Sequence, residues 1–254
     1  MRYLRLFVLF LVATLALAVI VAATCPAQFA YHLVADRLGA VKLEGIGGSI
    51  WQGHATSVRI FGTEVGALDW RLQPMPVLQG TIVANLVLSG GDIGASGEVE
   101  RAFDGTIEAR ALTLRAPARI AAPALDIPAL QLLGDLEATV AYVRLRQAWP
   151  EAASGSAHWR NAAVAGAAQA QLGDIEASFA SGPDGSINGN VHDLGGPLQL
   201  NGTFKVAAGS YDAEAKLQSR DGNAQVAEAL RYIGEPQADG SSHLVIHGQL
   251  FKVF

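Results

Sequence analysis

Residues 81–91 read TIVANLVLSGG, and this stretch decides the fold that the sequence predicts. Its residues fall into two alternating sets, Ile82, Ala84, Leu86 and Leu88 on one side and Thr81, Val83, Asn85 and Val87 on the other. A period of two is typical of a half-buried β-strand, because successive side chains point to opposite faces of a sheet. Gly90 and Gly91 then interrupt the pattern, so the stretch predicts a strand followed by a turn.

The same pattern recurs on both sides of this stretch. In residues 64–72, Leu68, Trp70 and Leu72 share one face and Asp69 and Arg71 take the other. Residues 210–218 alternate in the same way, with small or apolar side chains against charged or polar ones. Further breaks at hairpin spacing occur at Asp104-Gly105, Asp184-Gly185 and Gly195-Gly196. Short strands separated by such breaks indicate an antiparallel meander and not alternating βαβ units.

A weak internal repeat divides the predicted β domain, residues 43–254. Gly48 and Gly155 lie 107 positions apart, and so do Gly66 and Gly173. We therefore expect two related meanders, residues 43–115 and 134–254, joined by a segment rich in Pro and Ala. The predicted fold class is mainly β: a twisted, largely antiparallel sheet shaped as a trough or a sandwich.

Two short helices are expected beside the sheet. Residues 27–38, within a connector at 25–42, place Phe29, Leu33 and Val34 at helical spacing before Gly39. Residues 224–233 repeat apolar side chains at the same spacing, and Gly234 follows. A glycine directly after the last periodic residue is a typical helix stop.

The N-terminus predicts a single transmembrane helix. Residues 6–24 are 19 residues without a charge, nearly enough to span a hydrocarbon core of roughly 30 Å. Arg2 and Arg5 precede this segment, which places residues 1–5 in the cytoplasm and the β domain in the periplasm of a bacterial cell. Two alternatives are a cleaved signal peptide and a lipoprotein whose acylated residue is Cys25.

Composition narrows the classes of function. The net charge of −5 and the scarcity of clustered Lys and Arg argue against nucleic acid as a partner. The single cysteine, Cys25, permits no disulfide within the chain. A Gly-rich, Cys-poor chain with one predicted anchor suggests a bacterial envelope protein.

The sequence contains no recognisable catalytic, metal-binding or cofactor-binding motif, so we expect a protein that is not an enzyme. The glycines at 91, 94 and 97 do not fit the dinucleotide fingerprint, and neither a P-loop nor a nucleophile elbow is present. His243 and His247 lie four residues apart in a predicted strand, where that spacing covers about 13 Å and does not suit one metal ion.

Five aromatic residues are candidates for structural roles or partner contacts. They are Trp51, Trp70, Trp159, Phe251 and Phe254. Burial of a tryptophan ring in the core is the simpler interpretation, because each ring removes a large area from water. The run from His243 to Phe254 predicts a strand that is either internal or a free sheet edge, and a free edge would pair with another chain.

Several short segments resemble those of the type II secretion system protein N family, also called general secretion pathway protein N. The first segment runs from Gly47 to Ala55 and reads GGSIWQGHA, and the second, LDWRLQP, runs from Leu68 to Pro74. The stretch GSAHWRN (155–161) and the C-terminal GQL (248–250) complete the resemblance.

The resemblance implies an inner-membrane accessory subunit of the type II secretion machine. It further implies contacts with other inner-membrane subunits or with the secretin, and no catalytic residues or cofactors. The Gly-x-x-Trp-x-Gly pattern also resembles AsmA-type envelope proteins, which implies the alternative of a β-groove that binds or transfers lipid. In that alternative the apolar face of the sheet holds acyl chains, whereas a filled core is the simpler expectation.

Overall fold

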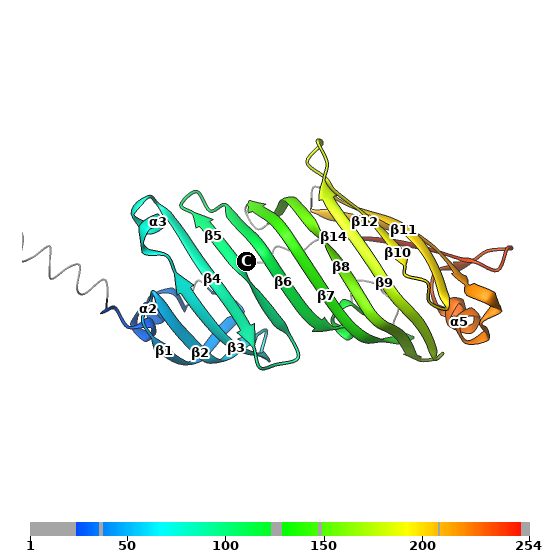
Figure 1. Cartoon of the computed structure of the whole chain (residues 1–254), viewed down its shortest axis with the longest axis horizontal. Helices are drawn as coiled ribbons and strands as arrows, with labels where there is room; N and C mark the ends of the chain where they lie inside the picture. Colours follow the sequence, from blue (N-terminus) through cyan, green and yellow to red (C-terminus); the bar gives the residue numbers. More distant parts are fainter. Residues whose placement is uncertain (1–23, 36–37, 123–128, 147–148, 208, 250–254) are drawn as a thin grey trace, which may run out of the picture.

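The computed structural model describes residues 24–35, 38–122, 129–146, 149–207 and 209–249. Figure 1 shows one broad sheet whose strands follow the order of the chain from β1 to β12. The strands are β1 (Val41–Gly48), β2 (Gln52–Ile60), β3 (Thr63–Leu72), β4 (Thr81–Ser89), β5 (Gly94–Ala102), β6 (Ile107–Pro117), β7 (Leu130–Arg146), β8 (Trp149–Gly166), β9 (Ala170–Ser181), β10 (Ile187–Asp193), β11 (Leu198–Ala207), β12 (Ser210–Ser219), β13 (Glu235–Pro236) and β14 (Ser242–Gln249).

The sheet is antiparallel throughout, and β14 lies between β12 and β13. The predicted fold class is confirmed as mainly β and antiparallel. Of the two predicted shapes, the structure has the trough, because the 14 strands of the described residues form one sheet and no second sheet is found among these residues. Pairing continues from β6 to β7, from Ile107 opposite Leu145 to Pro117 opposite Asp135, so the sheet runs unbroken through the predicted joint.

The hairpins follow from their turn residues. Phe61 and Gly62 both have positive φ angles between β2 and β3, as a two-residue type I′ turn requires. At the β5–β6 turn, Asp104 accepts a hydrogen bond of 2.8 Å from the backbone N–H of Thr106. Short polar side chains that bond the backbone two residues on favour such turns over a continued strand.

Each half of the sheet contains the same pair of glycines at a turn. Gly90 and Gly195 have positive φ angles and open space around them. The next glycine in each pair lies against backbone: a Cβ on Gly91 would stand 2.4 Å from the carbonyl oxygen of Val65, and one on Gly196 would stand 2.5 Å from that of Leu172. Val65 and Leu172 are 107 positions apart, which matches the predicted repeat. The domain boundaries remain a prediction.

Both predicted helices are present but shorter. The first is α2 (Ala27–Val34), and the second is α5 (Ala224–Ala229), which the 3₁₀ turn η4 (Leu230–Tyr232) extends. The sequence analysis missed a helix, α3 (Pro74–Leu78), and two 3₁₀ turns, η2 (Ala118–Ala121) and η3 (Arg220–Gly222). In α3, Pro stands in the first turn, where its missing N–H costs no helical hydrogen bond.

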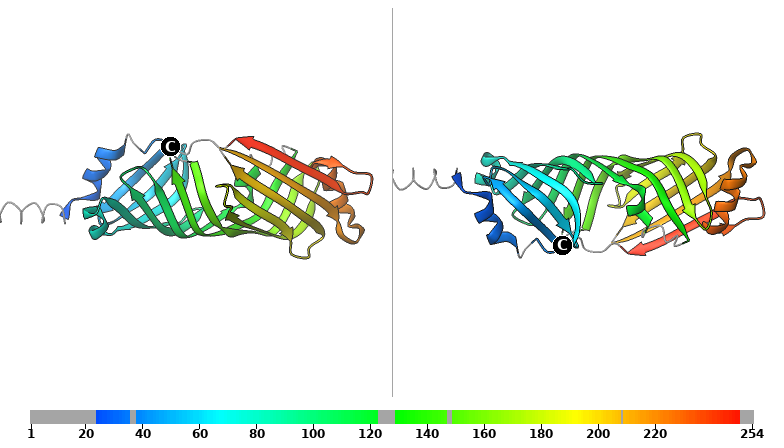
Figure 2. Two further views of the ribbon diagram at one scale, coloured as in Figure 1. Left: turned by 90° about the horizontal axis from the view of Figure 1, so that it is seen from above. Right: turned by 90° about the horizontal axis from the view of Figure 1, so that it is seen from below.

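The sheet curls so that its last strands lie across from its middle strands (Figure 2). Buried residues of β7, β8, β9, β11, β12, α5 and η4 form one core cluster in the second half of the sheet. Leu132 of β7 and Leu244 of β14 line one cavity although several strands separate them, so the sheet is concave on this face.

The predicted membrane anchor at 6–24 lies outside the described residues except for Thr24, and Arg2 and Arg5 lie outside them too. Among the helices that the structure does describe, none combines the length and the apolar composition needed to cross a bilayer. The anchor and the orientation it implies therefore remain predictions.

Candidate functional site: an apolar trough with an open edge

The strand register gives the sheet one apolar face. Leu68, Trp70 and Leu72 of β3 stand opposite Leu88, Leu86 and Ala84 of β4. Residues paired in this way point to the same side of a sheet. The same side continues through strand after strand as far as Phe204 opposite Ala213 and Ala213 opposite Ile246. We call this concave side the apolar trough, defined by these paired positions.

In the second half of the sheet, the apolar trough contains a half-open cavity of about 500 Å³. Its wall is built from β7 to β14 and includes Trp159, Ile175, Leu200, Phe204, Ala215 and Ile246. The sequence analysis favoured a filled core for this face. The space remains because small residues, Gly202, Ala213 and Ala215, lie on this face of β11 and β12, and the segment that covers it among the described residues is a short helical one.

That helical segment closes one end of the cavity. Asn223 caps α5, because its side-chain oxygen accepts a hydrogen bond of 3.1 Å from the N–H of Val226. Val226 and Ala229 are fully buried against the sheet. Leu230 and Ile233, which follow on the same apolar stripe, line the cavity itself. The apolar residues that the sequence places at helical spacing thus form the closed end of the cavity.

A partly buried ion pair fixes the turn next to α5. The Asp193 carboxylate accepts hydrogen bonds from the backbone N–H groups of Leu200 (2.9 Å) and Gly195 (3.0 Å), and it also pairs with the Arg220 guanidinium. Burial on its own raises the pKa of Asp193, but these two N–H groups and Arg220 together hold that pKa below its usual value. Arg220 also donates to the carbonyl oxygen of Gly196 at 2.8 Å.

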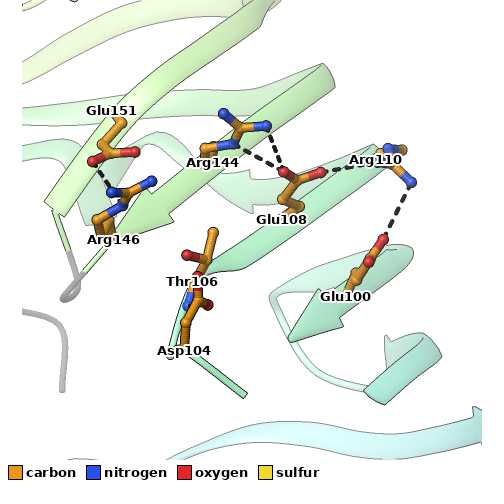
Figure 3. A network of polar contacts seen from close by, with 8 residues as sticks. All are labelled: Glu100, Asp104, Thr106, Glu108, Arg110, Arg144, Arg146 and Glu151. Atoms are coloured by element: carbon orange, nitrogen blue, oxygen red, sulfur yellow. Dashed lines mark hydrogen bonds and ion pairs between the residues drawn. The ribbon is translucent and has the colours of Figure 1, made fainter. Parts of the chain in front are cut away.

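The opposite, outer face of the sheet is polar and carries a network of ion pairs (Figure 3). Glu108 accepts from Arg144 at 2.7 Å and from Arg110 at 2.9 Å, and Arg110 also reaches Glu100 at 3.4 Å. Burial alone raises the pKa of Glu108, but hydrogen bonds from Arg144 and Tyr142 hold it below its usual value.

A second group on this face links the three strands β6, β7 and β8. Glu137 accepts from Arg115 and from Arg160, each at 2.6 Å. A single exposed ion pair stabilises a fold little, but ion pairs that are connected across three strands help to hold these strands side by side. Both networks lie where the two predicted repeats join.

The two edges of the sheet differ. The β1 edge is partly covered by the preceding segment: the Tyr31 hydroxyl accepts a hydrogen bond from the N–H of Leu43, and the backbone carbonyl of Cys25 accepts one from Ile50, just after β1. Pro26 and Ser49 add an isolated bridge. Cys25, which the sequence analysis considered as an acylation site, thus contributes its backbone carbonyl to the contacts at this end of the sheet.

The β14 edge is open over most of its length. β13 pairs only with Ser242 and His243. Residues 244–249 pair with β12 on one side, and within the described part of the chain no strand lies on their other side. The run carries no Lys, Pro or bulge, which are the usual protections of an edge, and Val245 is 47% exposed. Of the two placements considered for His243 to Phe254, residues 244–249 show the edge, His243 is paired on both sides, and residues 250–254 lie outside the described part of the chain.

The three predicted tryptophans lie in two places. Trp51 and Trp70 belong to neighbouring segments at the start of the sheet, and the indole N–H of Trp70 donates to the carbonyl oxygen of Ile50 at 3.2 Å. Trp159 is remote from them, lines the cavity and donates to the carbonyl oxygen of Leu133 at 2.8 Å. All three rings are half-buried. Their contact roles remain predictions, and Phe251 and Phe254 lie outside the described residues.

Within the described ranges, no group of three or more His, Cys, Asp or Glu side chains could hold a metal ion. His243 and His247 face two different carboxylates, Glu214 at 2.8 Å and Asp212 at 2.6 Å. The expectations of no metal, no cofactor and no enzymatic activity remain predictions.

These features define a class, an open antiparallel sheet with an apolar inner face, a polar outer face and one free edge. Residues 39–245 match the family described as "Type II secretion system (T2SS), protein N". The chain belongs to that family, and the resemblance of its short segments is thereby confirmed.

A relative supports the same assignment. The chain is 31% identical over 144 residues to the type II secretion system protein N of Vibrio cholerae serotype O1. That match covers 55% of this chain and 57% of the relative, so it spans little more than half of either protein. No solved structure gives a significant match.

Proposed function

We propose that this chain is an accessory subunit of the type II secretion machinery that acts through protein–protein contacts. The match to the protein N family over residues 39–245 carries this proposal. The matched residues run through the sheet from β1 into β14. The partners are other subunits of the same machine, either inner-membrane subunits or the secretin.

The proposed location is the bacterial inner membrane, with the sheet in the periplasm. The uncharged segment at 6–24 and the preceding Arg2 and Arg5 support it. Pro26 and Ser49 bridge the segment after the proposed anchor to the end of β1. A tether at that point leaves the β14 edge free to reach a partner.

The open β14 edge is the proposed contact. An exposed row of backbone N–H and C=O groups pairs readily with an added strand, and alternate side chains of that strand then meet the two faces of the sheet. Tyr31 contacts the β1 edge at Leu43, and Cys25 bonds Ile50 just after that strand, so among the described strands the β14 edge is the more open to strand addition.

Crosslinking in secreting cells tests this contact. A photoreactive phenylalanine analogue at position 245 is expected to capture another type II secretion subunit, identified by mass spectrometry. The matched control is position 87, because Val87 of the internal strand β4 is 46% exposed and Val245 is 47% exposed. We expect at least ten times more crosslinked partner from position 245.

Equal capture from both positions, or none from position 245 while secretion is active, would refute strand addition at β14. The role in secretion has a separate test. Deletion of the gene should leave folded exoproteins in the periplasm, and normal secretion in the deletion strain would contradict the proposed function itself.

A further inference from the structure

The cavity in the apolar trough has no hydrogen-bonding partner to offer a ligand. Its lining side chains are apolar almost without exception, and the strands from β7 to β12 use their backbone N–H and C=O groups in ladders with a neighbour on each side. Water is a poor occupant, because a buried water needs two to four polar partners. An apolar molecule is therefore the occupant that this lining suits.

A peptide segment does not suit this site. An extended peptide would bring backbone polar groups that find no partner there, at a cost of kilocalories per group. A helix satisfies its own backbone only over several turns, and one turn about 10 Å wide and 5.4 Å long takes roughly 420 Å³. A cavity of about 500 Å³ holds little more than that one turn.

A linear hydrocarbon chain meets both conditions. It carries no polar group along its length, and a methylene group takes about the space of a water molecule. At ~30 Å³ for each group, the 500 Å³ of the cavity hold roughly 16 methylene groups. Leu230 of η4 and Ile233 directly after it line one end, so the length of chain that the cavity holds is limited.

We infer that this cavity binds one linear acyl chain of about 16 carbons. Its terminal methyl group lies toward Leu230 and Ile233, and its polar end leaves over the β11–β12 hairpin end, where Val206 pairs with Tyr211 and both line the site. This inference goes beyond the proposed secretion role and does not depend on it. The bound acyl chain belongs to a free fatty acid or to a membrane phospholipid.

Photolabelling of the full-length protein in lipid nanodiscs tests the inference. One arm uses palmitate with a diazirine at its methyl end, and the other uses phosphatidylethanolamine carrying the same labelled chain. We expect labelled peptides from β11, β12 or η4. Labelling by palmitate alone identifies a fatty acid, and labelling in both arms identifies phospholipid as a ligand.

Variants separate cavity binding from adhesion to the surface. Ala215→Trp and the milder Ala213→Leu fill the cavity from β12, and each should reduce labelling at least tenfold while the protein stays folded. Asn201→Trp is the matched control, because Asn201 lies on β11 with its side chain exposed on the outer face. Its labelling should equal that of the wild type.

Competition by unlabelled fatty acids tests the predicted length. The potency should rise from eight carbons to about 16 and then stop rising, because the closed end limits the chain. Labelling that survives in both cavity-filling variants, or that maps only to residues outside the cavity, would overturn the inference. Loss of secretion in the deletion strain is independent of all these outcomes.

Discussion

Gly196→Ala is expected to lower the free energy of unfolding by about 3 kcal/mol, because the new methyl group has no room. A Cβ there would stand 2.5 Å from the carbonyl oxygen of Leu172 and 2.6 Å from the Cα of Gly173. Both neighbours are backbone atoms of β9, so relief requires a strand to move. Urea denaturation of the full-length protein, followed by tryptophan fluorescence, measures the change.

The adjacent glycine provides the control. Gly195 has a φ of +95° and open space around it, so Gly195→Ala carries only the conformational cost of about 1 kcal/mol. A loss for Gly196→Ala no greater than that for Gly195→Ala would contradict the close approach of turn and strand.

The same experiment tests the internal repeat. Gly91 and Gly90 of the first half have the geometry of Gly196 and Gly195, with Val65 in the place of Leu172. Gly91→Ala should therefore destabilise more than Gly90→Ala by a similar margin. Comparable differences in the two halves indicate that one structural unit is present twice.

Local patterns predicted the strands because the pleat imposes a period of two on every half-buried strand. Residues 81–89 and 210–218 were identified within one residue of β4 and β12 for this reason. The glycine repeat was visible at an offset of 107, since backbone contacts leave no alternative to glycine at Gly66 and Gly173. Strand alternation and obligatory glycines leave a local signal in the sequence, which can be read without knowing the rest of the fold.

The cavity and the open edge could not be predicted so directly. The cavity depends on how far the sheet curls, which brings Leu132 of β7 and Leu244 of β14 to one site. Each strand carries ordinary small residues there, such as Ala213 and Ala215, that a filled core would also show. The edge depends on the order of strands, and in particular on β13 being only two residues long.

Asp193→Asn is expected to lower the free energy of unfolding by about 2 kcal/mol at pH 7, because a partly buried, hydrogen-bonded ion pair loses its negative partner. The Asp193 side chain is only 9% exposed and accepts from the N–H groups of Leu200 and Gly195 as well as pairing with Arg220. Asp92→Asn is the control. Asp92 also pairs with an arginine, but its side chain is 72% exposed, so the change should be within about 0.5 kcal/mol.

The pH dependence of stability distinguishes loss of charge from general damage. The folded pKa of Asp193 lies below its usual value of about 3.9, so the ionised carboxylate stabilises the fold above that pH. This contribution is lost as the pH falls through the folded pKa. The free energy of unfolding of the wild type should therefore fall more steeply below about pH 5 than that of Asp193→Asn. Parallel acid limbs for the two proteins would show that the Asp193 charge does not hold the turn beside α5, and that the closed end of the cavity rests on apolar packing alone.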